Sequence, residues 1–378
     1  DEHEYATSHQ NKHPGGKKEV SRGVFCEYRR EPLGVVASIT PFNFPAMVPM
    51  WTIPIALTLG NSFVWKPSEK TPLTSQLLAS ALQEAGLPKG VFTVLQGGKS
   101  VVEAVIDHPS VKAISFVGST AVARVVYERG TRLGKRVLAL GGAKNHIFLL
   151  PDADTALTGK GIADSFVGCA GQRCMAASVL LPVNNPENQI QSIVNAASQV
   201  RLGEDMGAII SKTQLEFLKS AIDRAEKSGA RILLDGRKVN VPKEYEGGYW
   251  LGPTILDQVE PDSEAATLEL FGPVLSIVRT KGLKEALEVE NKNPYGNAAS
   301  VFTNTGGIAD FISANAKAGM IGVNIGVPVP REPFSFGGIN ESKFGHGDIT
   351  GDHSLNFWTN IKKVTTKWQN QNDATWMS

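Results

Sequence analysis

Residues 34–65, which read GVVASITPFNFPAMVPMWTIPIALTLGNSFVW, carry the pattern that decides the fold. Residues 34–40 form a β-rich apolar run that ends at Pro41, residues 48–59 have the composition of a buried helix, and residues 61–65 resume as a strand. A strand, a helix and a second strand in this order make one β-α-β unit. The stretch therefore predicts an α/β protein.

The alternation of strands and helices extends over much of the chain. Strands are predicted at 91–95, 113–117, 136–140, 146–150, 178–182 and 231–234, and helices at 73–85, 100–107, 121–129, 161–167, 190–198 and 213–228. Such alternation implies a parallel sheet with helices on both faces. Gly141 and Gly142 interrupt the pattern, and we place a domain boundary there.

The ends of the chain differ from this pattern. Residues 1–18 are polar and lack the apolar core of a signal peptide, so a flexible arm is predicted. Residues 357–368 alternate like a strand. The Gly- and Pro-rich stretch 327–338 predicts ordered loops in which Phe334 and Phe336 are buried.

Composition excludes several classes of protein. The chain has 378 residues, of which 42% are hydrophobic, so it is able to bury a core. With 38 Lys and Arg against 37 Asp and Glu the net charge is +1, and nucleic acid is not expected as a partner. The apolar stretch 46–59 is shorter than the ~20 residues of a membrane span and contains prolines, so no membrane contact is expected.

Cysteine content bears on the compartment. The chain has three cysteines, an odd and small number that does not suit a disulfide framework and is compatible with a reducing compartment. We expect the cytoplasm, with the mitochondrial matrix as the alternative if a presequence has been removed.

Two short stretches have the features of a nucleotide site. The predicted strand 113–117 runs into Gly118, Ser119 and a helix, whose free N–H groups attract anions and whose glycine lets a phosphate approach. Lys66-Pro67-Ser68-Glu69 follows the second strand of the opening unit, and the side chains of Lys66 and Glu69 are able to hydrogen-bond a ribose. Taken alone, the first stretch is explained about as often by an ordinary capped helix, and the second is better explained by a solvated turn.

Cys174 is the candidate nucleophile. It lies in CAGQRCM, residues 169–175, where small residues let the backbone approach a ligand and Arg173 favours a thiolate. We therefore expect Cys174 to be the one essential thiol and the first to be alkylated. A buried structural cysteine is the other interpretation, and no metal site is expected, because no His-x-His or Cys-x-x-Cys pair supplies further zinc ligands.

Six motifs in order resemble those of the aldehyde dehydrogenase superfamily. They are PFNFP at 41–45, KPSE at 66–69, FVGS at 116–119, LGG at 140–142, GQRC at 171–174 and ELFGP at 269–273. The resemblance covers roughly residues 30–368. Within the superfamily, GGAKNH at 141–146, PFSFGG at 333–338 and Arg173 are most similar to the CoA-acylating methylmalonate-semialdehyde dehydrogenases.

The resemblance implies a domain organisation. It places a Rossmann-like NAD-binding domain at 32–141 and an α/β catalytic domain at 142–352. Strands within 19–31 and a C-terminal segment at 353–378 are expected to form a small oligomerisation sheet, and hence a homodimer or homotetramer.

The resemblance also implies roles for single residues. Cys174 is the expected nucleophile, Asn43 and the Cys174 backbone N–H form the oxyanion hole, and Arg173 binds the substrate carboxylate. Lys66 and Glu69 are expected at the adenosine ribose of NAD, Ser119 at its pyrophosphate, and Glu269 with Phe271 at its nicotinamide ribose. The full set expected to bind the coenzyme is Phe42, Lys66, Glu69, Gly118, Ser119, Glu269 and Phe271.

Two features depart from the superfamily pattern. Hydrolytic members carry a glutamate before Leu-Gly-Gly as the general base for water, and here that position is Ala139. Positioned general bases contribute ~10²–10⁴-fold, so coenzyme A rather than water is the expected acyl acceptor. Members also begin well before the first residue of this chain, with helices and a second carboxylate-binding arginine that the given sequence lacks.

These observations predict NAD-dependent, CoA-acylating oxidation of malonate or methylmalonate semialdehyde to acetyl-CoA or propionyl-CoA. A hydrolytic aldehyde dehydrogenase with a simpler aldehyde is one alternative, and Ala139 argues against it. A shortened relative that keeps the fold without catalysis is the other, and the intact Cys174, Asn43 and Glu269 argue against it.

Overall fold

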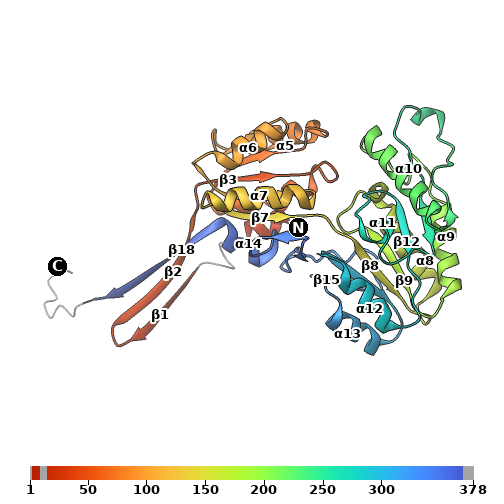
Figure 1. Cartoon of the computed structure of the whole chain (residues 1–378). Helices are drawn as coiled ribbons and strands as arrows, with labels where there is room; N and C mark the ends of the chain where they lie inside the picture. The colour runs from red at the N-terminus through yellow and green to blue at the C-terminus, as the bar shows by residue number, and fades with distance from the viewer. Residues whose placement is uncertain (1, 9–14, 369–378) are drawn as a thin grey trace, which may run out of the picture.

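The computed structural model describes residues 2–8 and 15–368. It has two lobes, each built on its own sheet, and a long antiparallel sheet that extends away from the first lobe (Figure 1). Both large sheets are mostly parallel, which confirms the predicted α/β class. In the ranges described, no helix combines the length and apolar character needed to cross a membrane.

The first lobe contains six strands in the order β17-β7-β6-β3-β4-β5. They are β3 (Val35–Ile39), β4 (Ser62–Lys66), β5 (Phe92–Val94), β6 (Val111–Val117), β7 (Arg136–Leu140) and β17 (Lys343–Phe344), with β17 antiparallel to β7. The helices α3 (Met47–Met50), α4 (Ile53–Thr58), α5 (Pro72–Glu84), α6 (Lys99–Asp107) and α7 (Thr120–Arg132) connect them. Ala37 of β3 and Ile114 of β6 are fully buried, as expected in a sheet covered on both faces.

One predicted helix, at 48–59, is two short helices in the structure. α3 ends at Met50, and α4 begins at Ile53. Pro54 lies in the first turn of α4, where its missing N–H breaks no helical hydrogen bond. The proline therefore marks the start of a second helix, and the prediction of one continuous helix is wrong.

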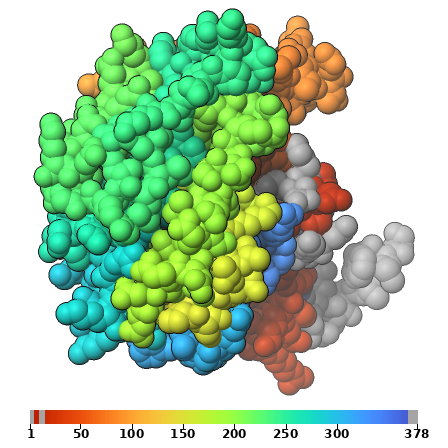
Figure 2. Space-filling model, turned by 90° about the vertical axis from the view of Figure 1, so that its right-hand side faces the viewer, coloured from red at the N-terminus to blue at the C-terminus, as the bar shows by residue number. Residues whose placement is uncertain are grey.

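The second lobe contains seven strands in the order β10-β11-β12-β9-β8-β14-β15, and only β10 is antiparallel to its neighbour among them. The strands are β8 (Asn145–Leu149), β9 (Ala177–Pro182), β10 (Arg231–Leu234), β11 (Thr254–Asp257), β12 (Val274–Ile277), β14 (Ala298–Phe302) and β15 (Met320–Val323). The helices are α8 (Thr155–Val167), α9 (Glu187–Ser198), α10 (Lys212–Lys227), α11 (Glu264–Thr267), α12 (Leu283–Lys292) and α13 (Gly306–Asn315), with a 3₁₀ turn η2 (Lys243–Tyr245). Figure 2 looks onto this lobe, which covers most of the face in view.

The chain crosses between the lobes at residues 141–144, where β7 leads into β8. It returns after β15 to form β17 on the first sheet, and α14 (Gly351–Trp358) then packs against α4. The segment 142–352 expected to form one catalytic domain thus contributes its last part to the first lobe. Between these parts, β13 (Tyr295–Gly296) and β16 (Ile339–Asn340) pair as a two-stranded sheet.

The projecting sheet is formed by β1 (Gly16–Ser21), β2 (Val24–Pro32) and β18 (Thr359–Lys367). β18 pairs with β2 along its full length, so both segments expected to supply oligomerisation strands meet here. The strand predicted at 357–368 starts only at Thr359, because Phe357 and Trp358 end α14. Residues 369–378 of the predicted C-terminal segment lie outside the described residues.

The start of the chain differs from the predicted flexible arm. Residues 2–7 form helix α1 (Glu2–Thr7), which packs against α4, and Tyr5 and Ala6 are buried. The Tyr5 hydroxyl donates a hydrogen bond to the Asp352 carboxylate. Two buried side chains are enough to dock this otherwise polar segment, while residues 9–14 of the predicted arm lie outside the described residues.

The loops at 327–338 bury only one of their two phenylalanines. Phe336 is buried against Trp51, with ring centroids 4.6 Å apart. Phe334 is 73% exposed and lies in a turn closed by a hydrogen bond from its amide to the Arg331 carbonyl. The predicted burial of Phe334 is therefore wrong.

Candidate functional site

Cys174 lies in residues 168–176, a segment between α8 and β9 that we term the cysteine loop. The loop opens with a 3₁₀ turn, η1 (Gly168–Gly171), in which Cys169 and Ala170 have φ of 52° and 54°. Left-handed backbone at such residues costs of order 1–3 kcal/mol and persists only where the surroundings fix it. A Cβ on Gly171 would lie 2.0 Å from the Gly272 carbonyl oxygen, so the loop is packed backbone to backbone against the segment before β12.

Two asparagines hold the backbone at Cys174. The Nδ2 atoms of Asn145 and Asn297 both donate to the Cys174 carbonyl, each at 2.8 Å. Asn145 is the first residue of β8, and Asn297 directly precedes β14, its neighbour in the sheet. The cysteine loop is thus fixed to two adjacent strands of the second lobe.

The Cys174 thiol is half-buried and favours its neutral form. Burial raises the pKa of Cys174 to about 12, the negative charge of Glu269 raises it further, and the nearby charge of Arg173 lowers it by less. The expected stabilisation of a thiolate by Arg173 is therefore outweighed. The exposure of Cys169 argues against the predicted order of alkylation, in which Cys174 reacts first.

Asn43 reaches the cysteine loop from the first lobe, where it follows β3. Its Nδ2 donates to the Gln172 carbonyl at 2.8 Å. A side-chain amide has two N–H groups, so the Asn43 amide is able to donate a second hydrogen bond. Gln172 is fixed in turn by the Ile210 amide, which donates to its Oε1 at 3.0 Å.

Glu269 lies between α11 and β12, facing the crossover between the lobes. Its Oε1 accepts a hydrogen bond from the Ala143 amide at 2.9 Å. Burial raises the pKa of Glu269 to about 7, although this hydrogen bond and the positive charge of Lys144 both lower it. Such a carboxyl group is able to change its protonation state near neutral pH.

Phe271 continues the same segment and has a φ of 56°. Gln214 of α10 holds this strained backbone, because its Nε2 donates to the Leu270 carbonyl at 2.8 Å. The Phe271 ring meets the Phe42 ring edge-on, with centroids 6.0 Å apart. The structure thus brings these two expected coenzyme residues together, one from each lobe.

The remaining expected coenzyme residues follow β4 and β6. Lys66 is buried at the end of β4, and its Nζ donates to Glu69 Oε2 at 2.9 Å. A backbone hydrogen bond and then Lys66 lower the pKa of Glu69, although partial burial raises it, so this half-exposed carboxylate is charged at neutral pH. Ser119 is the N-cap of α7, and its side chain makes no capping hydrogen bond. A Cβ on Gly118 would lie 2.6 Å from the Phe116 ring.

These groups fit a dinucleotide. Residues 43, 66 and 118 all lie at or just beyond the carboxyl ends of parallel strands, the edge where open α/β sheets bind ligands. The set offers an ammonium and a carboxylate to ribose hydroxyls, free N–H groups and a hydroxyl to phosphate, and a second carboxylate at Glu269.

Arg173 has an unsatisfied donor. Its guanidinium packs over Gly168, where a Cβ would lie 2.4 Å from Arg173 Cζ. The Nε is buried and has no hydrogen-bond partner within the part of the chain that the structure describes. Leaving such a donor unpaired costs about 1–3 kcal/mol, and a bound anion would remove that cost.

Ala139 is fully buried on β7, where it pairs with Phe116 of β6 and Phe344 of β17. Its methyl group offers no proton acceptor. Among residues 2–8 and 15–368, no group of three His, Cys, Asp or Glu side chains could hold a metal ion.

Sequence reasoning missed several residues that support the site. They are Asn145 and Asn297 at the Cys174 carbonyl, Gln214 at the Phe271 backbone, and the buried Lys144. A signal was present for two of them, because Lys144 and Asn145 are polar residues that introduce an apolar strand. Asn297 and Gln214 are distant in sequence from the backbone groups that they contact, so only the folded chain brings them to the site.

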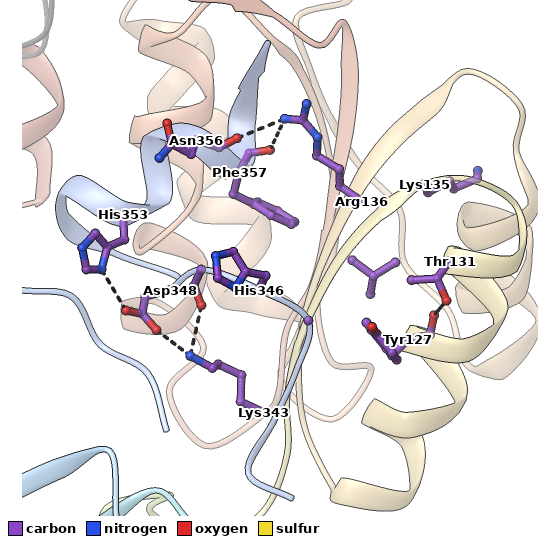
Figure 3. Close-up of a pocket in the computed structure, with 13 residues that line it drawn as sticks. Tyr127, Thr131, Lys135, Arg136, Lys343, His346, Asp348, His353, Asn356 and Phe357 are labelled. Carbon is purple, nitrogen blue, oxygen red and sulfur yellow. Dashed lines mark hydrogen bonds and ion pairs between the residues drawn. The ribbon is translucent and has the colours of Figure 1, made fainter. Parts of the chain in front are cut away.

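A separate cavity of about 660 Å³ lies near the opposite end of β7, next to α14 (Figure 3). In it Lys343 and His353 both point toward Asp348, and Arg136 bonds the carbonyls of Asn356 and Phe357. None of the expected site residues lines this cavity.

Comparison with known sequences links the chain to one family. A model described as "Aldehyde dehydrogenase family" matches residues 1–364. Malonate-semialdehyde dehydrogenase 1 of Oceanobacillus iheyensis is 42% identical over 356 residues, which are 92% of this chain and 73% of that protein. The mitochondrial methylmalonate-semialdehyde/malonate-semialdehyde dehydrogenase [acylating] of Rattus norvegicus is 42% identical over 352 residues, 92% of this chain and 65% of that one.

Solved structures agree with this relationship. A Sinorhizobium meliloti structure in complex with NAD, assigned as a methylmalonate-semialdehyde dehydrogenase, has a TM-score of 0.95 at 38% identity and covers 98% of this chain and 77% of that chain. The methylmalonate-semialdehyde dehydrogenase of Oceanimonas doudoroffii has a TM-score of 0.95 at 39% identity, with 98% of this chain and 78% of that chain covered.

Proposed function

Because this chain belongs to the aldehyde dehydrogenase family, we propose that it oxidises malonate or methylmalonate semialdehyde with NAD and transfers the acyl group from Cys174 to coenzyme A. The products are acetyl-CoA or propionyl-CoA. Once Cys174 carries the thioester, the bond between the substrate's carboxylate and its α-carbon breaks, the electron pair is taken up as the thioester enolate, and the α-carbon takes a proton from solvent. The carboxylate leaves as CO₂ or, after addition of water, as bicarbonate. The named relatives support the choice of substrate, and the residues of the site support the chemistry.

Cys174 forms the covalent bond to the substrate. Its thiol gives its proton to solvent, and the sulfur attacks the aldehyde carbon to form a thiohemiacetal. The resulting oxyanion needs neutral donors, which the second N–H of Asn43 and the Cys174 backbone N–H supply. Asn145 and Asn297 keep that backbone in place through the Cys174 carbonyl.

Bound NAD would supply the hydride acceptor, and loss of hydride from the thiohemiacetal carbon would leave a thioester on Cys174. Lys66 and Glu69 bind its adenosine ribose, Ser119 and the N-terminus of α7 its pyrophosphate, and Glu269 its nicotinamide ribose. The charged Glu69 repels a 2′-phosphate, so NAD is preferred over NADP.

Ala139 is the observation that carries the acyl-transfer part of the proposal. Water needs a general base to attack the thioester, and the position of that base in hydrolytic relatives holds a buried methyl group here. A thiol with a pKa near 8.5 is a few per cent ionised at neutral pH without such help. The thiolate of coenzyme A attacks the acyl carbon, and the Cys174 sulfur leaves.

Arg173 binds the carboxylate of the semialdehyde. Its unpartnered Nε and its place directly before Cys174 support this role. A guanidinium is able to bind a carboxylate through two parallel hydrogen bonds.

We further infer that the chain associates with copies of itself through the sheet β1-β2-β18. Val20, Tyr28 and Ile361 on this sheet are each about half exposed, and the three strands project away from the first lobe (Figure 1). A second copy would cover these side chains.

Product analysis tests the proposed function. The protein is incubated with methylmalonate semialdehyde, NAD and coenzyme A, and the products are separated and identified by mass spectrometry. We expect propionyl-CoA from the wild type and none from Cys174→Ala. Free acid as the main product in the presence of coenzyme A would assign the chain to the hydrolytic branch, and the absence of NADH would indicate a fold without catalysis.

A further inference from the structure

Lys144 is a buried lysine at the crossover between the lobes, and the steps described above do not use it. Burial lowers the pKa of Lys144 to about 7, although the negative charges of Glu269 and Glu264 raise it, so its positive charge is present below neutral pH and is lost as the pH rises. Its side chain is 2% exposed, and it lies directly before β8. Its Nζ donates to the Leu268 carbonyl at 2.8 Å. A buried ammonium group is costly unless nearby negative charge compensates it.

Two hydrogen bonds join residues 143–144 to residues 268–269. The Ala143 amide donates to Glu269 Oε1, while the next residue, Lys144, donates to the Leu268 carbonyl. A Cβ on Gly142 would lie 2.2 Å from Glu269 Oε2, so the carboxylate rests directly on the crossover backbone. Two bonds and one steric contact thus fix where Glu269 lies.

Several other titratable groups face this pair. The negative charge of Glu264 on α11 raises the pKa of Lys144. Glu264 also forms an ion pair with Arg224 of α10. His146 of β8 is buried and stays neutral, because burial and the charge of Lys144 lower its pKa to about 3. Cys174 and Tyr295 each have a pKa raised by burial and by the charge of Glu269. Within the described residues, Lys144 is the cation whose charge stabilises ionised Glu269.

We propose that Lys144 is a positioning residue that holds Glu269 charged and in place to accept hydrogen bonds from the nicotinamide ribose of NAD. This inference rests on the proposed function, which places the ribose at Glu269. An ionised carboxylate accepts bonds from both ribose hydroxyls, whereas a protonated one loses an acceptor site. Lys144 therefore determines the pH range in which the coenzyme binds tightly.

Burial sets the direction of this pH dependence. The pKa of Glu269 is raised to about 7, so protonation should weaken NAD binding as the pH falls below that value. Removal of the Lys144 charge raises the pKa of Glu269 further, because the positive charge lowers it in the wild type. The loss of affinity should then begin at a higher pH.

Direct measurement of NAD affinity tests the inference without relying on turnover. Isothermal titration with NAD at pH 6 to 9 is carried out on the wild type, Lys144→Met, Lys144→Arg and Glu269→Gln. Lys160→Met is the control, since Lys160 is an exposed lysine of α8 that pairs with Asp164. We expect Lys144→Met to weaken NAD binding up to about fivefold at pH 7 and to approach wild-type affinity at pH 9, because a rise of about one unit from a pKa near 7 lowers the ionised fraction of Glu269 at pH 7 by about that factor.

The other variants separate the possible causes. Lys144→Arg keeps a permanent positive charge. As the pH is lowered, its affinity for NAD should therefore begin to fall at the same pH as in the wild type or at a lower one. Glu269→Gln should bind NAD weakly at every pH, and adding Lys144→Met to it should have no further effect. Lys160→Met should match the wild type.

Each contrary result has a distinct meaning. An unchanged pH profile in Lys144→Met, together with weak binding in Glu269→Gln, would overturn the role of Lys144 alone. Wild-type binding in Glu269→Gln would instead refute the placement of the ribose at Glu269. If Lys144→Met does not fold, Lys144→Arg decides the matter. The proposal is contradicted if the NAD affinity of Lys144→Arg falls at a higher pH than that of the wild type as the pH is lowered.

Discussion

At Cys174, burial and the charge of Glu269 oppose ionisation of the thiol, and the single guanidinium of Arg173 does not offset them. The residue types at the site could be predicted because they occur in short motifs with fixed order. The protonation state of the Cys174 thiol could not be predicted from the sequence, because it depends on Glu269, which is distant in the chain but close in space. The same holds for the buried Nε of Arg173, which has no hydrogen-bond partner among residues 2–8 and 15–368.

The rate of alkylation of the thiols tests whether burial and Glu269 suppress ionisation of Cys174. Without added coenzyme at pH 7, iodoacetamide should modify the exposed Cys169 before Cys174. A thiol with a pKa of about 12 gains roughly tenfold in thiolate per pH unit, so the rate at Cys174 should rise about tenfold from pH 7 to 8 and again from 8 to 9. Peptide mapping by mass spectrometry gives both rates, and a fast, pH-independent reaction at Cys174 would refute the assigned environment.

Substitution of Arg173 tests its proposed contact with the substrate. Arg173→Leu should raise KM for methylmalonate semialdehyde by at least about tenfold, as expected from the loss of a charge-assisted hydrogen bond worth about 1.5–3 kcal/mol. KM for propanal, which has no carboxylate, should change little. Steady-state kinetics with both aldehydes distinguishes this role from an effect on Cys174 itself, which would impair both substrates equally.

At the scale of elements, the cysteine loop is fixed by contacts that come from four directions. Asn145 and Asn297 bind it from two strands, Asn43 from the first lobe, and Gly272 from the segment before β12. Local periodicity predicted most strands and helices up to residue 234, but not the helices α11, α12 and α13. The split between α3 and α4, the exposed Phe334 and the pairing of β17 with β7 could not be predicted, since each depends on residues distant in the chain.

Gly171 is the position where this packing is most sensitive. Gly171→Ala places a methyl group 2.0 Å from the Gly272 carbonyl at a φ of 68°, so the loop must move. Gly229→Ala is the matched control, because Gly229 also has a positive φ but nothing within 4 Å of its Cβ position. Urea unfolding should show a loss of about 1–2 kcal/mol for the control and more for Gly171→Ala. Only Gly171→Ala should abolish NADH formation, and equal behaviour of the two variants would count against the packing argument.

At the scale of the whole molecule, the crossover at 141–144 joins two lobes that each supply part of the site. The alternating pattern predicted a parallel sheet but no strand between residues 234 and 357, so it missed β11, β12, β14 and β15 of the second sheet. The glycines at 141 and 142 indicated the junction. The return of the chain to the first lobe as β17 and α14 was not predictable, because it requires the assembled sheet as its partner. The sheet β1-β2-β18 projects away from the first lobe (Figure 1).

Self-association through that sheet is tested by a change on its surface. Ile361 of β18 is 45% exposed, and Ile361→Glu should shift the assembly toward single chains by placing charge in the contact. Leu157→Glu on α8, where the side chain is 48% exposed, is the control and should leave the mass unchanged. Sedimentation velocity gives the mass of each, and a wild type that sediments as one chain would refute the inferred contact.

The fate of the thioester on Cys174 tests the central claim most directly. Rapid mixing of the protein with semialdehyde and NAD, without coenzyme A, should release about one NADH per Cys174 and then slow, because Ala139 provides no base for water and the acyl enzyme accumulates. Addition of coenzyme A should restore steady turnover. Rapid steady turnover without any thiol, with free acid as the product, would contradict the account.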